Sequence, residues 1–202
     1  SASNPTKGVD NNEMYFGIGD YADPVKNLSH TADLAKKYNK PIIITEGGSG
    51  YLSGYADTAT FAADRIREAY TTLNMVYPQV KAIIHFDRSG SGYDYSLQNN
   101  ATVQAAYNSA LKSNPTLMSS PSQTVTQSFK PLSQVTGANG VVTLRAYCDV
   151  IGQTVTVTYS VDGKWVGTQK TVPYNCQLDT STLTAGNHTL KVVCNAPNGY
   201  SQ

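Results

Sequence analysis

The chain has 202 residues, of which 40% are hydrophobic and 14% are charged. This length allows one large domain or two small ones, and the hydrophobic content is sufficient for a packed core. With 15 basic and 14 acidic residues, the formal net charge is +1. The sequence therefore lacks the basic excess that nucleic acids or anionic lipid surfaces attract, and it has no apolar run long enough to span a bilayer.

The first half of the chain alternates predicted strands with predicted helices. Apolar runs predict strands over residues 14–19, 41–46 and 80–87, and helical periodicity predicts helices over residues 29–39, 58–77 and 101–113. In the second of these helices, Phe61, Ile66, Ala69, Tyr70 and Leu73 fall on one face. Alternation of this kind predicts a parallel sheet with crossover helices.

The second half of the chain has a different character. Residues 114–123 are rich in Pro and Ser and have no periodicity, so we place a linker at residues 116–124. Beyond it, Thr- and Val-rich segments predict short strands over residues 141–148, 154–161, 165–171, 176–178 and 188–194, separated by turn signals. Regular short strands of this kind predict a β-sandwich.

One segment resembles a known enzyme family. The run Leu34-Ala-Lys-Lys-Tyr-Asn-Lys-Pro-Ile-Ile-Ile-Thr-Glu-Gly-Gly48 is similar to the seventh barrel strand of clan A retaining glycoside hydrolases, especially family 26, which usually has Phe-Gly at the position of Gly47-Gly48. The resemblance implies that residues 1–115 form about the last three units of a partial (β/α)8 barrel. A missing N-terminal barrel segment or a neighbouring chain would then supply the other strands.

The same resemblance implies the catalytic residues. Glu46 matches the nucleophile, and the acid/base glutamate of the family lies on the fourth strand, which precedes Ser1. Tyr21 matches a tyrosine that orients the nucleophile by a hydrogen bond. The alternative is that Glu46 is an ordinary exposed carboxylate at a strand end and that Tyr21 is an ordinary loop tyrosine.

Residues 80–87 resemble the eighth barrel strand, whose end carries an aromatic platform for the sugar. His85 and Phe86 occupy the place where tryptophan is common in the clan. Tyr51, Tyr93 and Asp94 are further candidates for contact with sugar. The alternatives are a core histidine bonded to neighbouring backbone for His85, and turn or packing roles for the other residues.

Four motifs in the second half resemble a bacterial immunoglobulin-like domain of the kind appended to secreted and surface enzymes. They span residues 160–168, 172–174, 178–181 and 185–192, so the resemblance covers residues 125–202, with the last strand expected to be missing. In that fold the three cysteines lie at one end, where Cys148 and Cys194 resemble the usual inter-sheet disulfide and Cys176 is an alternative partner. No close Cys or His spacing predicts a metal site.

Together these features predict a secreted or cell-surface retaining endo-β-glycanase of mannanase type that acts on a β-linked plant or algal polysaccharide without a cofactor. The alternative is a non-catalytic structural or adhesive subunit of an extracellular filament or surface layer. Whether the chain is an enzyme stays open, because the acid/base carboxylate is not within it. A carbohydrate-binding module is a weaker third reading, since the single tryptophan, Trp165, is expected to pack beside the Asp162-Gly163 hairpin.

Overall fold

The structure is a computed structural model that describes residues 23–90, 92–118, 120, 122–125, 129–148 and 155–197. The chain divides into two compact units, Ser1–Phe129 (unit 1) and Lys130–Gln202 (unit 2), which are described separately. The strand predicted over residues 14–19 lies outside the described residues. No helix in the described part of the chain is long and apolar enough to cross a membrane.

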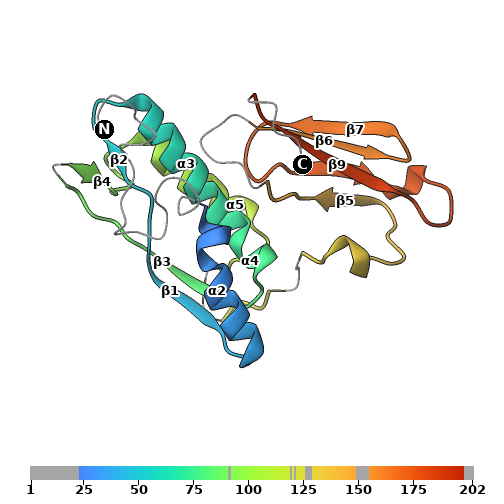
Figure 1. The fold of residues 1–202 in the computed structure, drawn as a ribbon, viewed down its shortest axis with the longest axis horizontal. Coiled ribbons are helices and arrows are strands. Elements are labelled where there is room, and N and C mark those ends of the chain that lie inside the picture. The colour runs from blue at the N-terminus through green and yellow to red at the C-terminus, as the bar shows by residue number, and fades with distance from the viewer. Residues whose placement is uncertain are drawn as a thin grey trace. The chain divides into compact units, whose positions relative to one another are not determined.

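Unit 1 is a small α/β structure built around a parallel strand pair (Figure 1). Its elements in chain order are α2 (Pro24–Lys37), β1 (Ile42–Gly47), β2 (Tyr51–Leu52), α3 (Ala56–Thr71), α4 (Leu73–Val76), β3 (Val80–His85), β4 (Tyr93–Asp94) and α5 (Ala101–Ser113). β1 and β3 run parallel with Ile44 opposite Ile83, and the helices α3 and α4 connect them. The prediction of parallel strands with a helical crossover is confirmed for this pair.

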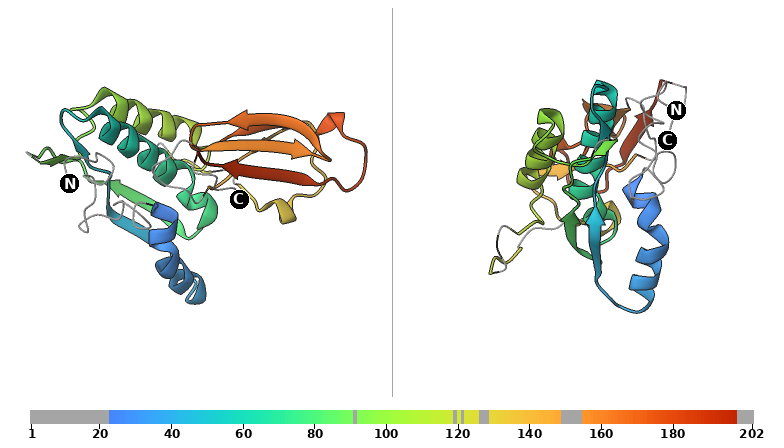
Figure 2. Two further views of the ribbon diagram at one scale, coloured as in Figure 1. Left: turned by 45° about the horizontal axis from the view of Figure 1, so that its top comes forward. Right: turned by 90° about the vertical axis from the view of Figure 1, so that its left-hand side faces the viewer.

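Helix α3 packs along α5, as Figures 1 and 2 show. The apolar face predicted for the helix over residues 58–77 is buried: its four residues in α3 and Leu73 in α4 are all less than a tenth exposed. Residues from α2, β1, α3 and α5 share one core, which includes Leu28, Ile44, Ile66 and Val103. Burial of this apolar surface is the main force that holds unit 1 together.

The ends of the helices correct two predicted boundaries. α2 begins at Pro24, five residues before the predicted start, because the Asp23 carboxylate accepts the N–H groups of Val25 and Lys26 as an N-cap and proline suits the first helical position. The predicted single helix over residues 58–77 is two helices, which meet at Thr72. α5 has its predicted bounds, and the Asn100 side chain caps it.

One face of the β1–β3 pair carries apolar side chains that the described residues leave uncovered. Ile43 is 59% exposed and Ile84 is 56% exposed, whereas Ile42 and Ile44 on the helix-covered face are buried. Parallel sheets are normally covered on both faces. The strand pair therefore has an apolar surface that the described part of unit 1 does not bury.

Unit 2 contains two antiparallel sheets, one of β5 and β8 and one in the order β7-β6-β9 (Figure 1). Its elements are the 3-10 helix η2 (Leu132–Gln134), β5 (Val141–Leu144), β6 (Thr156–Val161), β7 (Lys164–Gln169), β8 (Cys176–Asp179), the 3-10 helix η3 (Thr180–Thr182) and β9 (Leu190–Asn195). The five strands correspond to the five predicted ones, although β5 is only half as long as predicted.

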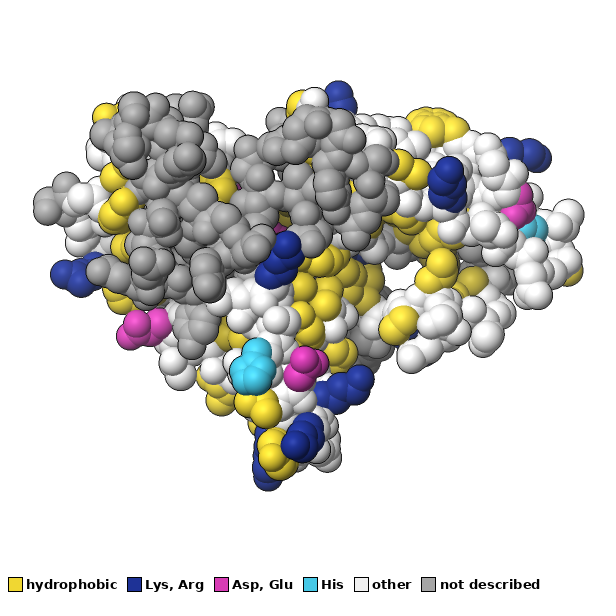
Figure 3. Space-filling model, in the orientation of Figure 1, with side chains coloured by type: hydrophobic (Ala, Val, Ile, Leu, Met, Phe, Trp, Pro, Cys, Tyr) yellow, Lys and Arg dark blue, Asp and Glu magenta, His cyan; other side chains and the backbone are white. Residues whose placement is uncertain are grey.

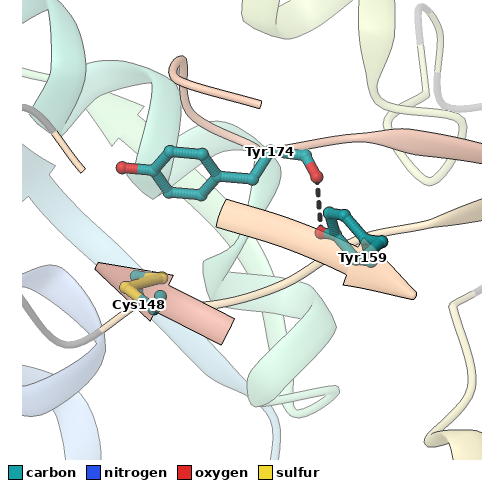
Figure 4. Close-up of a disulfide and its surroundings, with 4 residues drawn as sticks. Cys148, Tyr159 and Tyr174 are labelled. Atoms are coloured by element: carbon teal, nitrogen blue, oxygen red, sulfur yellow. Dashed lines mark hydrogen bonds between the residues drawn. A yellow bond between two sulfur atoms is a disulfide. The ribbon is translucent and has the colours of Figure 1, made fainter. Parts of the chain in front are cut away.

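Alternation along β6 separates the core of unit 2 from its outer surface. Val157, Tyr159 and Val161 are buried, whereas the threonine and serine side chains between them are partly exposed. The Tyr159 hydroxyl donates a 2.6 Å hydrogen bond to the backbone carbonyl of Tyr174, as Figure 4 shows. This bond ties β6 to the segment that precedes β8.

Candidate functional site

Glu46 and His85 lie at the same edge of the parallel strand pair. Gly47, which follows Glu46, is opposite His85, and the Phe86 N–H donates a 3.0 Å hydrogen bond to the Gly47 carbonyl. Both residues are therefore at the carboxyl end of a parallel strand, the edge at which barrel enzymes bind substrates. The Glu46 side chain is exposed, and within the described residues no hydrogen bond or ion pair holds its carboxylate.

The loop after Glu46 is closely packed. Residues 47–50 are all buried, and Ser49 is only 1% exposed. A Cβ atom on Gly50 would lie 2.8 Å from Cε1 of Tyr95, so only glycine allows the loop to approach that ring. The Ser49 hydroxyl has no hydrogen-bond partner within the described structure. The exposed carboxylate of Glu46 is thus followed directly by a tightly packed loop.

Tyr51 and Asp94 are both buried near this edge of the strand pair. They face each other in the short antiparallel pair β2–β4, which the sequence did not predict. The buried Tyr51 hydroxyl donates to the Ser96 carbonyl at 2.8 Å, and burial, with Asp94 and Asp87 adding to it, raises the pKa of Tyr51 to about 12. The two Asp94 oxygens accept the Ser96 N–H and the Asn99 amide, so both are already engaged.

The His85 side chain is partly buried at the end of β3. Its Nδ1 lies 3.3 Å from the Tyr70 hydroxyl, and its ring centroid lies 5.1 Å from that of Tyr107. Burial lowers the pKa of His85, although the Tyr95 backbone and Asp87 act in the opposite direction. The His85 ring thus packs against side chains of α3 and α5, and its role as a platform for a sugar stays a prediction.

Phe86 and Tyr93 are partly buried beside the same loop. The Phe86 ring packs edge to face against Tyr95, with ring centroids 5.3 Å apart. Tyr93 is opposite Leu52 in the β2–β4 pair. Asp87 accepts the Leu97 N–H at 3.1 Å, a hydrogen bond that links the segment after β3 to the segment after β4. The structure thus gathers these predicted residues into one region around Glu46.

Tyr21 lies outside the described residues. The search for metal sites covered the described residues alone, and among them no group of three or more His, Cys, Asp or Glu side chains is placed to hold a metal ion. Glu46 is an exposed ionisable side chain at this edge of the strand pair.

In unit 2 the structure joins Cys148 to Cys194 by a disulfide, with their Cα atoms 6.4 Å apart (Figure 4). Cys176 is a free, buried thiol, and burial raises its pKa. All three cysteines are part of the same core cluster. A raised pKa disfavours the thiolate, which is the reactive form, so Cys176 is suited to packing.

The exposure of Trp165 and the contacts of His188 were not predicted from the sequence. The expectation that Trp165 packs beside the hairpin is wrong, because the side chain is 69% exposed. His188 bridges two acceptors, since Nδ1 lies 2.6 Å from Oδ2 of Asp162 and Nε2 lies 2.8 Å from the Thr184 carbonyl. Both contacts raise the pKa of His188, because each favours the protonated ring. A lone histidine far from Asp162 in sequence gave no signal for this pair.

Comparison with known proteins adds information on the second half of the chain. The model of the bacterial Ig domain family matches residues 121–192. No curated protein and no solved structure matches the chain significantly. The family match does not extend to the first half of the chain, for which the resemblance to family 26 stays a prediction. Ig-like domains of this kind are typical of extracellular and surface proteins. The chain therefore contains a bacterial immunoglobulin-like domain at residues 121–192.

Proposed function

We propose that unit 1 is part of a retaining β-glycan hydrolase in which Glu46 is the nucleophile. The observation that supports this most is the position of Glu46, an exposed carboxylate at the carboxyl end of a parallel strand next to a second strand that ends at the same edge. Glu46 has no bonding partner within the described residues, so its carboxylate is free to approach a substrate.

The proposed reaction requires a second carboxyl group. The Glu46 carboxylate attacks the anomeric carbon while a carboxylic acid about 5 to 5.5 Å away protonates the departing glycosidic oxygen. The second group is then a carboxylate. It takes a proton from a water molecule as that water attacks the glycosyl ester and releases Glu46. We place that group on another part of the barrel, supplied by a further segment or a neighbouring chain.

The uncovered apolar face of β1 and β3 supports a larger sheet. Ile43 and Ile84 are both more than half exposed, and a barrel would bury such side chains in its interior. The Ig-like domain in the same chain is consistent with a secreted or surface enzyme. The proposed substrate is a β-linked plant or algal polysaccharide.

The test is hydrolysis by the full-length protein and its Glu46→Ala variant, with mannan, β-1,3-xylan and mixed-linkage glucan as substrates. We expect the variant to lose at least about a thousandfold in rate, and added azide to restore part of the cleavage by attacking the anomeric carbon in place of the carboxylate, with a glycosyl azide as the product. Asp33→Ala, at an exposed acidic residue of α2, is the matched control and keeps full activity. Undiminished hydrolysis by Glu46→Ala would exclude the proposal.

A second candidate is a non-catalytic building block of an extracellular filament or surface layer. The same exposed isoleucines favour it, because an uncovered apolar sheet face promotes association. It predicts that the native protein sediments as an assembly, that Ile84→Lys disperses the assembly, and that no glycan is hydrolysed. Hydrolysis that depends on Glu46 would rule this candidate out.

A further inference from the structure

The outer face of the β7-β6-β9 sheet places Trp165 in a row with two polar residues. Ser160 in β6 is opposite Trp165 in β7 on one side and opposite Lys191 in β9 on the other. Residues paired in this way share a face of the sheet. Because neighbouring strands are roughly 4.8 Å apart, the backbones of Trp165 and Lys191 are separated by about 10 Å.

The next row carries hydroxyl groups. Thr158 is opposite Thr168 in β7 and Val193 in β9. The Trp165 indole N–H donates a 3.1 Å hydrogen bond to the Thr168 hydroxyl, which ties the ring to this row. The side chain is nevertheless 69% exposed. The indole is thus oriented by a bond at its edge while much of its surface faces solvent.

The charged side chain in this row is positive. The Lys191 side chain is exposed and forms no ion pair with any described residue. The carboxylate of Asp162, in the turn that joins β6 to β7, has both oxygens engaged by His188 and the Thr189 N–H. On this side of unit 2, Figure 3 shows basic side chains next to hydrophobic ones, and the acidic side chain visible there lies beside a histidine.

We propose that this face binds an acidic polysaccharide. The apolar face of one pyranose ring stacks on the Trp165 indole, and the carboxylate or sulfate of the adjoining sugar pairs with the Lys191 ammonium. The Ser160 hydroxyl lies between these two positions and the Thr158 hydroxyl lies in the next row, and both bond sugar hydroxyls. An anionic chain complements the unpaired lysine, whereas a neutral chain leaves that charge without a partner.

Binding at this face is independent of the proposed hydrolysis, because no residue of unit 1 takes part. The experiment uses the full chain, and Glu46→Ala must bind as tightly as the unmodified protein. Loss of activity with retained binding would therefore separate the two proposals.

Affinity electrophoresis in gels that contain polygalacturonate, dextran sulfate or dextran tests the carboxylate, sulfate and neutral cases. We expect retardation by one or both acidic polymers and none by dextran. Trp165→Ala binds roughly tenfold more weakly, Trp165→Phe keeps part of the affinity, and Lys191→Gln binds about threefold more weakly with less sensitivity to salt. Because the chain has a single tryptophan, its emission in the unmodified protein reports contact at this ring directly.

The matched control is Val141→Ala, which removes an equally exposed apolar side chain from β5 in the other sheet. It should bind as the unmodified protein does, and circular dichroism should show that every variant is folded. The proposal is overturned if neither acidic polymer retards the protein, if dextran binds equally well, or if Trp165→Ala binds no more weakly than Val141→Ala.

Discussion

Replacing both Cys148 and Cys194 by alanine removes the covalent link within the core of unit 2. The disulfide joins residues separated by 46 positions in the sequence, from the segment after β5 to β9. Without it, the unfolded chain gains the entropy of an open loop of that length. The folded state loses little contact surface, because alanine also fills a small apolar site.

The expected loss follows from the length of the loop. Chain-entropy arithmetic for about 46 residues gives a decrease of about 4 kcal/mol in the free energy of unfolding at 25 °C. A domain of this size has a total unfolding free energy of roughly 4 to 11 kcal/mol. The double variant should therefore retain between almost none and about two thirds of the original stability.

Urea unfolding followed by tryptophan emission anisotropy measures this loss. Trp165 is the chain's single tryptophan and lies in unit 2, so the signal reports that unit within the full chain. The control is Cys176→Ala, which removes a buried free thiol and should cost only about 1 kcal/mol. In the unfolded protein, thiol titration should find one reactive group per chain.

Two outcomes would refute this reasoning. One is a double variant whose free energy of unfolding is within about 1 kcal/mol of the unmodified protein under oxidising conditions. The other is an equal loss of stability in both proteins when a reducing agent is added. The double variant has no disulfide left to reduce, so the reducing agent should leave its stability unchanged.

Two further predictions concern unit 2. Tyr159→Phe removes a buried hydrogen bond and should lower the free energy of unfolding by about 1 kcal/mol, which the same urea assay measures. Val141→Ala, at an exposed position of the same unit, should have little effect, and equal losses would contradict the role of the bond. Asp162 raises the pKa of His188, and His188 lowers that of Asp162. This pair therefore stabilises the fold fully between the ordinary pKa values of aspartate and histidine, and its contribution is lost as the pH rises through the raised pKa of His188. The urea midpoint should fall from about pH 5.5 to about pH 9 by more in the unmodified protein than in His188→Gln, and equal falls would contradict the assignment.

Periodicity predicted much of unit 1. Apolar spacing alone predicted α5 with its observed ends, and the Asn100 cap that marks its start was not used. The predicted start of α2 at residue 29 is five residues too late, because the N-cap is Asp23. The pair β2–β4 has only two residues in each strand, which is too short for an alternating pattern to be visible.

The candidate site was predictable as a place in the chain but not as a set of exposed groups. An apolar run that ends in a carboxylate predicted the position of Glu46. The burial of Tyr51 and the packing of His85 against two helices depend on contacts between residues far apart in sequence. The exposure of Trp165 likewise depends on which face of β7 is turned outward.

The role of Glu46 can be tested most directly by trapping the covalent intermediate. The full-length protein is incubated with a 2-deoxy-2-fluoro glycoside that carries a good leaving group, because the fluorine slows hydrolysis of the glycosyl ester more than its formation. Peptide mass spectrometry should then find the added sugar on the peptide that contains Glu46. A label on a different carboxylate, or an active enzyme that forms no labelled peptide, would contradict the assignment of Glu46 as the nucleophile.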